Sequence, residues 1–367
     1  MNGISQRALG VDSSGIRKVF DLAAKLKDPV NLSIGLPDFD AFPEVKQGAH
    51  EAIDSRRNGY TQTQGIAELR TTLSDQLGLA NHKDLSLFIT SGVSGGIFLS
   101  YMALLDPGDE VIIPDPYFCM YRDLATLINA VPKCCNCYPD FKLREEEIER
   151  QITPRTKALL VCSPGNPTGY AVSKGELNMA LAVAKRHGLW LLFDEIYSKF
   201  SYDQEHHTPF GEYEKLVVLN GFSKSHGITG WRVGYVVAPT YLVEQMCKLQ
   251  QYSFVCAPSI AQWGVLKGLD TDFSATLIEY RMKRDFMYEA LSGVFRLEKP
   301  NGAFYLFPEA PGGSGQKFIE KCVENGLLVV PGNVFSQRDT HFRISFSASM
   351  SQLERGAEIL NRLAKEY

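Results

Sequence analysis

The chain has 367 residues, 44% of them hydrophobic and 22% charged, with a formal net charge of −4. Its length predicts two domains, and its weak charge offers no basic surface for nucleic acid. No apolar run reaches the roughly 20 residues that cross a bilayer, and residues 1–10 lack the apolar core of a signal peptide, so we expect a cytoplasmic protein with no membrane partner.

Short apolar runs alternate with helical patterns between about residues 65 and 240. The runs predicted to form strands are 85–89, 110–113, a segment from Val131, 157–162, 189–193, 216–219 and 233–237. The helical patterns between them cover 66–79, 95–105, 117–129 and 176–186. Because the apolar runs are continuous rather than alternating, both faces of the sheet are expected to be buried, which is typical of a mostly parallel sheet covered by helices.

The pattern changes after about residue 270. A long helix is predicted over 272–291, followed by short strands and by helices over 316–325 and 351–365. We therefore predict an α/β protein whose large domain, residues 46–270, has a seven-stranded, mostly parallel sheet flanked by helices. A smaller α+β domain is expected from residues 271–367 together with the extended N-terminal segment, residues 1–45.

The eight cysteines are expected to be free thiols rather than a disulfide framework. Cys134 and Cys137 have the CxxC spacing of metal and redox sites, with Cys135 between them. No second cysteine or histidine pair has a matching spacing, and the segment is predicted to be extended, so we expect strand cysteines and no metal site. His206 and His207 are predicted to lie in a surface loop.

Lys224 follows the predicted strand 216–219, in a segment rich in glycine and serine. Loops at strand ends are where catalytic groups are displayed. A lysine withdrawn from water has a lowered pKa and can form a Schiff base with a carbonyl such as that of pyridoxal phosphate (PLP). Taken by itself, this segment fits an ordinary solvated lysine in a turn better, because most lysines are exposed.

Three other segments also follow predicted strands. Residues 90–96, TSGVSGG, open a helix and offer backbone N–H groups to an anion such as phosphate, or simply cap the helix. Residues 163–169, SPGNPTG, form a rigid turn that aims Asn166, or a turn without chemistry. Asp194 directly follows a buried strand, where a carboxylate needs a cationic partner such as a pyridinium N–H, unless it caps a helix.

Together and in this order, these segments resemble the class I/II aminotransferases of the fold-type I PLP-dependent enzymes, the aspartate aminotransferase superfamily. The resemblance covers nearly the whole chain. It is carried further by residues 60–70, 106–117, 220–235, 301–308 and 342–346.

The resemblance implies a role for each catalytic residue. Lys224 is expected to carry PLP as an internal aldimine and then to shuttle a proton. Asp194 is expected to pair with the pyridine nitrogen, and Asn166 and Tyr197 with the 3′-oxygen of the ring. The other implied cofactor residues are Gly92, Val93, Ser94, Ser223 and Arg232 at the phosphate, Tyr117 stacked on the ring, and Tyr60, which would reach the phosphate of the neighbouring subunit in a homodimer with shared active sites.

The substrate is expected to meet a second set of residues. Arg343 matches the arginine that binds the α-carboxylate, which a planar guanidinium can hold bidentately, with Asn166 beside it. Gly35 and Leu36 match a loop that closes over the substrate. Candidates for the side-chain pocket are Tyr60, Phe118, His226 and Leu36. Gly221 stands where many family members have a serine that contacts the phosphate, so one hydroxyl contact is expected to be absent.

The resemblance implies a PLP-dependent aminotransferase that moves an amino group between an L-amino acid and a 2-oxo acid by a ping-pong mechanism. The alternative is a β- or γ-eliminating lyase of the carbon–sulfur type, because such enzymes share the lysine, aspartate, asparagine and arginine. A PLP-binding transcriptional regulator is not expected, because the aminotransferase pattern begins by about residue 31 and no basic stretch precedes it.

Overall fold

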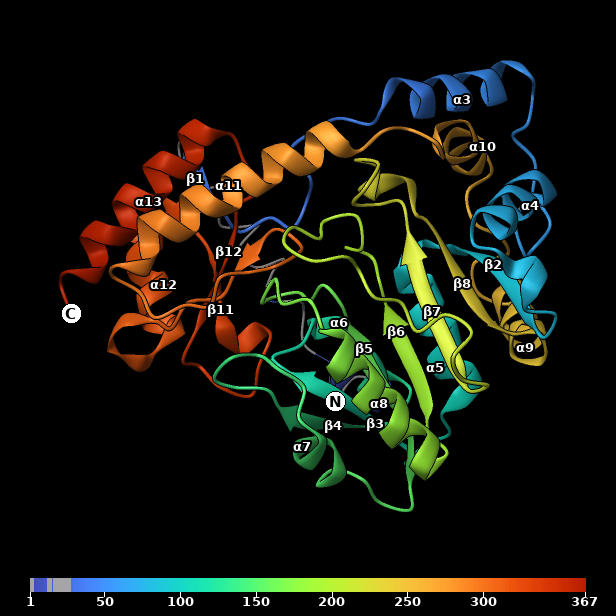
Figure 1. Cartoon of the computed structure of the whole chain (residues 1–367), viewed down its shortest axis with the longest axis horizontal. Helices are drawn as coiled ribbons and strands as arrows, with labels where there is room; N and C mark the ends of the chain where they lie inside the picture. The colour runs from blue at the N-terminus through green and yellow to red at the C-terminus, as the bar shows by residue number, and fades with distance from the viewer. Residues whose placement is uncertain (1–2, 12–14, 16–27) are drawn as a thin grey trace.

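A helix-covered sheet and a smaller body beside it make up the protein in the computed structural model, which describes residues 3–11, 15 and 28–367 (Figure 1). In order from one edge, the sheet contains β2 (Leu85–Ser91), β8 (Val233–Pro239), β7 (Leu216–Gly221), β6 (Trp190–Asp194), β5 (Thr156–Cys162), β3 (Glu110–Asp115) and β4 (Val131–Asn136). Neighbouring strands are parallel except that β8 is antiparallel to β2 and β7. The predicted α/β fold with a mostly parallel, seven-stranded sheet is confirmed.

Neighbouring residues of the central strands pack on opposite faces of this sheet. Leu159 and Leu191 belong to one apolar cluster, and Leu160 and Leu192 to another. The helices that contribute to the first cluster include α4 (Ala67–Gln76), α8 (Lys174–His187) and α10 (Ser259–Gly268). Those that contribute to the second are α5 (Gly92–Leu104), α6 (Cys119–Leu127) and α9 (Thr240–Gln251). Burial on both sides explains why the strand sequences are apolar throughout.

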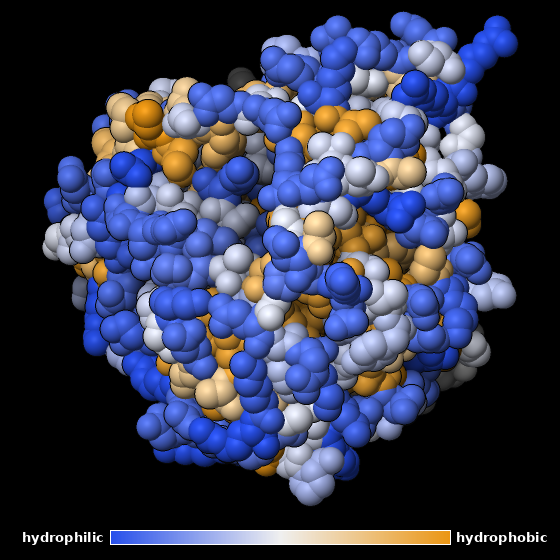
Figure 2. Space-filling view, turned by 45° about the vertical axis from the view of Figure 1, so that its right-hand side comes forward, coloured by the Kyte–Doolittle hydropathy of each residue, from blue (hydrophilic) through white to orange (hydrophobic). Residues whose placement is uncertain are grey.

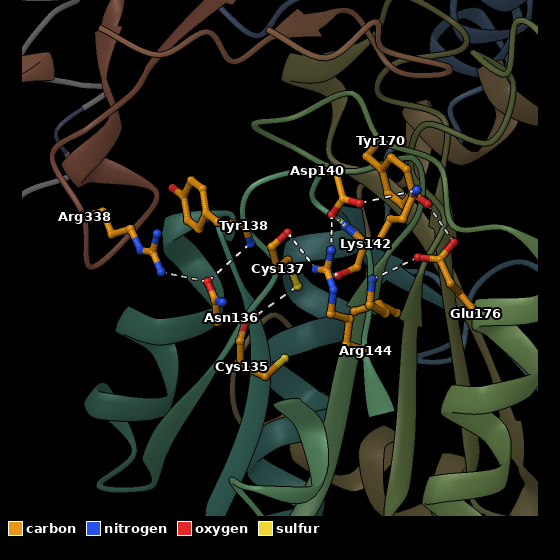
Figure 3. Close-up of polar contacts among 11 residues, drawn as sticks. Cys135, Asn136, Cys137, Tyr138, Asp140, Lys142, Arg144, Tyr170, Glu176 and Arg338 are labelled. Atoms are coloured by element: carbon orange, nitrogen blue, oxygen red, sulfur yellow. Dashed lines mark hydrogen bonds and ion pairs between the residues drawn. The ribbon is translucent and has the colours of Figure 1, made fainter. Parts of the chain in front are cut away.

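The boundaries of α8 follow directly from its local sequence. Ser173 and Glu176 form a capping box at the first turn, and Gly188 ends the helix in the left-handed conformation with φ 63°. Glu176 also accepts hydrogen bonds from the backbone N–H of Leu143 and the hydroxyl of Tyr170 (Figure 3). The helix start is thereby joined to the segment that follows β4.

The cysteine segment lies in and just after β4. Cys134 and Cys135 belong to the strand, and the Cys137 thiol donates to the Cys135 carbonyl oxygen at 3.7 Å (Figure 3). Across the described ranges, no group of three or more His, Cys, Asp or Glu side chains could hold a metal ion. His206 and His207 lie in a loop as predicted, although the His206 imidazole is mostly buried, with Nε2 3.2 Å from the Glu195 carboxylate.

The smaller body has its own apolar core. Its sheets pair β1 (Val30–Asn31) with β10 (Leu327–Leu328), and β12 (Phe342–Ser345) with β11 (Val330–Pro331) and β9 (Tyr305–Leu306). Its helices are α11 (Ser274–Ser292), α12 (Gly315–Glu324) and α13 (Met350–Ala364), with short turns η3 (Pro311–Gly313) and η4 (Gly332–Val334). The predicted division near residue 270 stays a prediction. The apolar cluster of the smaller body supports it, and Tyr197, Phe200 and Tyr202 of the larger part also join this cluster.

The remaining elements are short or lie near the large sheet. They are α1 (Gln6–Leu9), α3 (Pro43–Asp54), α7 (Glu145–Glu149), η1 (Leu79–Asn81) and η2 (Thr229–Trp231). Helix α3 packs on α10 at the upper right of Figure 1, where a Cβ on Gly264 would lie 2.8 Å from the Val45 carbonyl oxygen. Neither α3 nor α10 was predicted, because glycines that permit close packing also weaken a helical pattern.

The surface in Figure 2 is mainly hydrophilic, with separate apolar areas between the charged side chains. Within the part of the chain that the structure describes, no helix is both long and apolar enough to cross a membrane.

Candidate active site

A cavity of about 550 Å³ opens where the carboxyl ends of the central strands face the smaller body. The predicted residues that line it are Gly35, Leu36, Val93, Ser94, Asn166, Asp194, Tyr197, Ser223, Lys224, Arg232 and Arg343. Side chains from both bodies therefore meet in one space. Crevices at the carboxyl ends of parallel strands are the usual ligand sites of α/β sheets.

Lys224 lies three residues after the end of β7. Its Nζ donates to the Gly35 carbonyl oxygen at 2.7 Å and lies 5.9 Å from the centre of the Tyr197 ring. Burial, together with the positive charges of Arg343 and Arg232, lowers the pKa of Lys224 to about 8, and the negative charge of Asp194 opposes this shift. At neutral pH a larger share of this amine is therefore unprotonated and nucleophilic than of an ordinary lysine.

The lowered pKa of Lys224 predicts how the cofactor-free protein captures PLP. We expect the rate to rise with pH and to level off above about 8, because only the neutral amine attacks an aldehyde. Stopped-flow absorbance between pH 6 and 10 measures this. A rate that keeps rising to pH 10, as for an exposed lysine, would contradict the prediction.

Asp194 ends β6 and is only 2% exposed. One carboxylate oxygen accepts from the backbone N–H of Ile196 at 3.0 Å, and the other accepts from the Tyr121 hydroxyl at 2.8 Å. Burial raises the pKa of Asp194 to about 6, although both hydrogen bonds act against this rise. A nearby cation would stabilise the ionised form of this buried carboxylate, and the protonated nitrogen of a pyridine ring is such a cation.

Arg343 enters the cavity from β12 and is 1% exposed. Its two terminal nitrogens donate to the Asn166 side-chain oxygen at 2.8 Å and to the Ser33 carbonyl oxygen at 2.7 Å. Its Nε has no hydrogen-bond partner among the described residues. The guanidinium lies 4.6 Å from the centre of the Tyr305 ring. A buried, oriented guanidinium of this kind is suited to a carboxylate.

The end of the cavity at α5 is suited to an anion. Gly92 begins the helix with φ +67°, and a Cβ at this position would lie 2.5 Å from a terminal nitrogen of Arg232. Val93 and Ser94 continue the first turn, and Arg232 also donates to the Thr229 carbonyl oxygen at 2.9 Å. The helix N-terminus and the guanidinium therefore face the same space as Ser223.

Gly92→Ala is expected to weaken PLP retention at least about tenfold, because the new Cβ strains the backbone and displaces Arg232. The matched control is Gly230→Ala, since a Cβ at Gly230 has no atom within 4 Å. Equilibrium dialysis of both variants measures retention. Equal loss in the two variants would show that the contact with Arg232 has no special role.

The structure places three predicted cofactor residues outside the cavity. Gly92 lies behind its wall, against Arg232. Tyr60 is 88% exposed at the surface. Tyr117, predicted to stack on the ring, accepts a hydrogen bond from Arg122 at 3.1 Å, and its neighbour Phe118 lines the cavity instead. Both follow an extended segment, where neighbouring side chains point to opposite sides, so Phe118 rather than Tyr117 reaches the cavity, and the residue that stacks on the ring stays a prediction.

The predicted side-chain pocket is also only partly formed by the expected residues. Phe118 and Leu36 line the cavity. His226 does not, because its Nε2 bonds the Gly268 carbonyl oxygen at 3.3 Å and its ring packs edge-on against Phe222. Burial lowers the pKa of His226 to about 4, so it is neutral there.

Two tyrosines of the cavity were not predicted. Tyr121 bonds Asp194, and the Tyr305 hydroxyl lies 2.8 Å from that of Tyr197. Tyr121 lies three residues after Phe118, and residues with this spacing share one face of a helix. This spacing could have predicted that Tyr121 lines the cavity beside Phe118. Tyr305 pairs with Ser345 across β9 and β12, a contact between distant segments that no local pattern carries.

The loop that carries Gly35 and Leu36 is fastened to the smaller body. Asp38 pairs with the buried ammonium of Lys283 and accepts from the Tyr280 hydroxyl at 2.6 Å. The Ser347 hydroxyl donates to the Leu36 carbonyl oxygen at 2.6 Å. Movement of the smaller body would therefore carry this loop with it.

A mostly parallel α/β sheet with a lysine, an aspartate and two arginines gathered at its strand ends defines an enzyme of the α/β class. The family model for aminotransferase class I and II matches residues 27–360, and the chain belongs to this family. Members of the family are generally PLP-dependent.

Two named relatives resemble the chain over nearly its full length. It is 34% identical to the aspartate/prephenate aminotransferase of Thermus thermophilus, covering 99% of the chain and 100% of the relative. It is 33% identical to aromatic-amino-acid aminotransferase 2 of Thermococcus litoralis, covering 99% and 98%. Both are named as aminotransferases, so the lyase alternative is not favoured.

Solved structures agree with this assignment. Thermus thermophilus aspartate aminotransferase with maleate superimposes with a TM-score of 0.93 at 31% identity, covering 99% of this chain and 100% of that one. A Methanococcus jannaschii protein, described as similar in its active site to kynurenine aminotransferases, gives a TM-score of 0.89 at 28% identity, covering 98% and 100%.

Proposed function

We propose that this protein is a PLP-dependent aminotransferase that transfers the amino group of an L-amino acid to a 2-oxo acid, with Lys224 as the residue that binds the cofactor. The observation that carries the proposal is the position of the Lys224 amine, in one cavity with Asp194, Arg232 and Arg343. These groups match the separate charges of PLP and of an amino acid: a pyridine nitrogen, a phosphate and an α-carboxylate.

Different residues would hold different groups of the cofactor. Asp194 would hold the ring nitrogen, and Asn166 and Tyr197 would hydrogen-bond the 3′-oxygen. Phe118, rather than Tyr117, would pack against the ring. The phosphate would be held by the residues at and facing the start of α5: Gly92, Val93, Ser94, Ser223 and Arg232. When bound, PLP supplies an electron sink that stabilises negative charge at the substrate Cα.

The other residues act on the substrate. Arg343 and Asn166 would bind and orient the α-carboxylate, and Gly35 and Leu36 would cover the substrate and exclude water. Nζ of Lys224 would remove the proton from the substrate Cα and later return it. The same residues serve both half-reactions, so ping-pong kinetics are expected.

The test supplies the PLP-loaded enzyme with one amino acid at a time, first with and then without a 2-oxo acid acceptor. We expect turnover only with the acceptor, and one equivalent of oxo acid per site without it. Borohydride reduction is expected to fix PLP on the peptide that contains Lys224. Continuous release of ammonia and oxo acid without an acceptor would overturn the proposal and favour the lyase.

We also propose that the active unit is a homodimer in which Tyr60 reaches the partner's phosphate site. Tyr60 lies with Ser91 and Phe254 along a surface hollow of about 600 Å³, and Ser91 directly precedes Gly92. The neighbouring side chains Tyr252 and Val255 are also exposed. Together they form an apolar surface at the phosphate end that a second subunit would cover.

The dimer is tested by mixing two inactive or weakened proteins, Lys224→Ala and Tyr60→Phe. In hybrid dimers one site regains both native residues, so we expect PLP retention to recover in the mixture. Light scattering gives the mass of each species. A mixture that retains PLP no better than Tyr60→Phe alone would contradict the shared site.

A further inference from the structure

Tyr121 lies on the inner face of α6, is 2% exposed and lines the cavity. Its hydroxyl donates to Oδ2 of Asp194 at 2.8 Å. The ring packs edge-on against Phe118 with centroids 5.7 Å apart, and the Tyr121 carbonyl oxygen accepts from the Tyr101 hydroxyl at 3.3 Å. The side chain is therefore held by Phe118 and Asp194, whereas Tyr101 bonds only the backbone of Tyr121.

We propose that Tyr121 is a positioning residue of the active site, whose hydroxyl keeps the Asp194 carboxylate ionised and turned toward the ring nitrogen of the cofactor. The inference rests on the proposed function, because it assigns Tyr121 a role in that same site.

The geometry around Asp194 leaves a defined direction for a cation. Oδ1 is engaged by the backbone N–H of Ile196, and Oδ2 by Tyr121. Each carboxylate oxygen can accept more than one hydrogen bond. With one bond on each oxygen supplied by the protein, the carboxylate cannot rotate freely, and its remaining acceptor capacity can face the cavity.

Tyr121 can act only as a donor in this pair. Burial raises the pKa of Tyr121 well above its ordinary value of 10.0, and the nearby charge of Asp194 raises it further. The phenol therefore keeps its proton. Its hydrogen bond favours the charged form of Asp194, against the burial that raises the pKa of Asp194 to about 6.

The other ionisable groups around Asp194 do not replace this bond. Glu195, next in the chain, raises the pKa of Asp194, and Lys224, after β7, lowers it through charge. The Cys162 thiol at the end of β5 has a raised pKa, to which the charge of Asp194 contributes after burial, so it stays neutral. Among the described residues, no side chain other than Tyr121 hydrogen-bonds the Asp194 carboxylate; the other bond comes from the backbone N–H of Ile196.

The experiment compares Tyr121→Phe with Tyr101→Phe in the full-length protein. Each substitution removes one buried phenol hydroxyl from neighbouring helices, but only the first touches Asp194. In the cofactor-free protein, carbon-13 NMR of labelled aspartate, assigned with Asp194→Asn, reports the pKa of Asp194. In the PLP-loaded protein, the pH titration of the absorbance and the values of kcat and KM are measured.

For Tyr121→Phe we expect a higher pKa of Asp194, a shifted absorbance titration, and a fall in kcat of about 10- to 100-fold with KM little changed. Tyr101→Phe is expected to match the wild type in all of these. A purely structural role would lower the melting temperature of Tyr121→Phe without moving either titration, and that result would overturn the inference.

If Tyr121→Phe does not fold, 3-fluorotyrosine at position 121 provides the test, because the more acidic phenol is a stronger donor and is expected to lower the pKa of Asp194. An unchanged pKa would contradict the inference. The NMR measurement needs no cofactor, so it stands apart from the proposed function. A wild-type protein that fails to bind PLP would contradict the function, whereas an unchanged Asp194 would contradict only the role of Tyr121.

Discussion

Lys224→Ala is expected to abolish transamination, with a loss of about 10⁴-fold or more in kcat. The variant lacks both the amine that captures PLP and the base that takes the Cα proton. No other lysine lines the cavity among the described residues, so none can take its place. The variant is expected to fold normally, because the Lys224 amine makes one hydrogen bond, to the Gly35 carbonyl oxygen.

The matched control for this variant is Lys215→Ala. Lys215 directly precedes β7, at the opposite end of the strand from Lys224, and its amine donates to the Gly188 carbonyl oxygen. Coupled assays of both variants and mass spectrometry of borohydride-treated protein are the measurements. Near-native activity in Lys224→Ala, or reduced PLP found on another lysine of the wild type, would contradict the assignment.

Arg343→Lys is expected to lower kcat/KM by about 10²- to 10³-fold, mainly through a higher KM. Lysine keeps the positive charge but lacks the planar fork that bonds Asn166 and Ser33 through two nitrogens and can bind a carboxylate with two parallel N–H groups. PLP retention is expected to stay close to that of the wild type, because Arg343 is assigned to the substrate.

Arg338→Lys serves as the control, because Arg338 bonds Asn136 on the surface, outside the cavity. A further variant, Arg343→Leu, separates charge from geometry. Arg343 is the largest charge that lowers the pKa of Lys224, so its removal is expected to raise that pKa, whereas lysine should preserve it. Steady-state kinetics and the pH dependence of PLP capture measure the two effects. Unchanged kcat/KM in Arg343→Lys would remove Arg343 from substrate binding.

Much of the site was predictable because its residues belong to short segments that follow buried strands. Asp194 ends β6, and Asn166 and Lys224 come shortly after β5 and β7; the carboxyl ends of neighbouring parallel strands meet at one edge. Arg343 was predictable from the cost of an arginine in an apolar strand. The sequence did not show that Phe118 rather than Tyr117 lines the cavity, because an extended chain reverses its side chains at every step.

Other features depend on contacts between distant segments. The bond between Tyr121 and Asp194 spans 73 positions of the chain, and that between Arg343 and Asn166 spans 177. The order of strands in the sheet, with β8 inserted between β2 and β7, also has no local signal. Such pairings follow from how helices and strands pack.

The amino-acid sequence alone was sufficient for the α/β class, the seven strands and the segments that carry Lys224, Asp194 and Arg343, because each of these leaves a local pattern of apolar runs, glycines and isolated charges. The directions of the side chains and the state of their ionisable groups came only from the folded chain. Burial lowers the pKa of Lys224 and raises that of Asp194, and the packing of α6 against the sheet places the Tyr121 hydroxyl on the Asp194 carboxylate. Burial is a property of the packed protein rather than of any one segment.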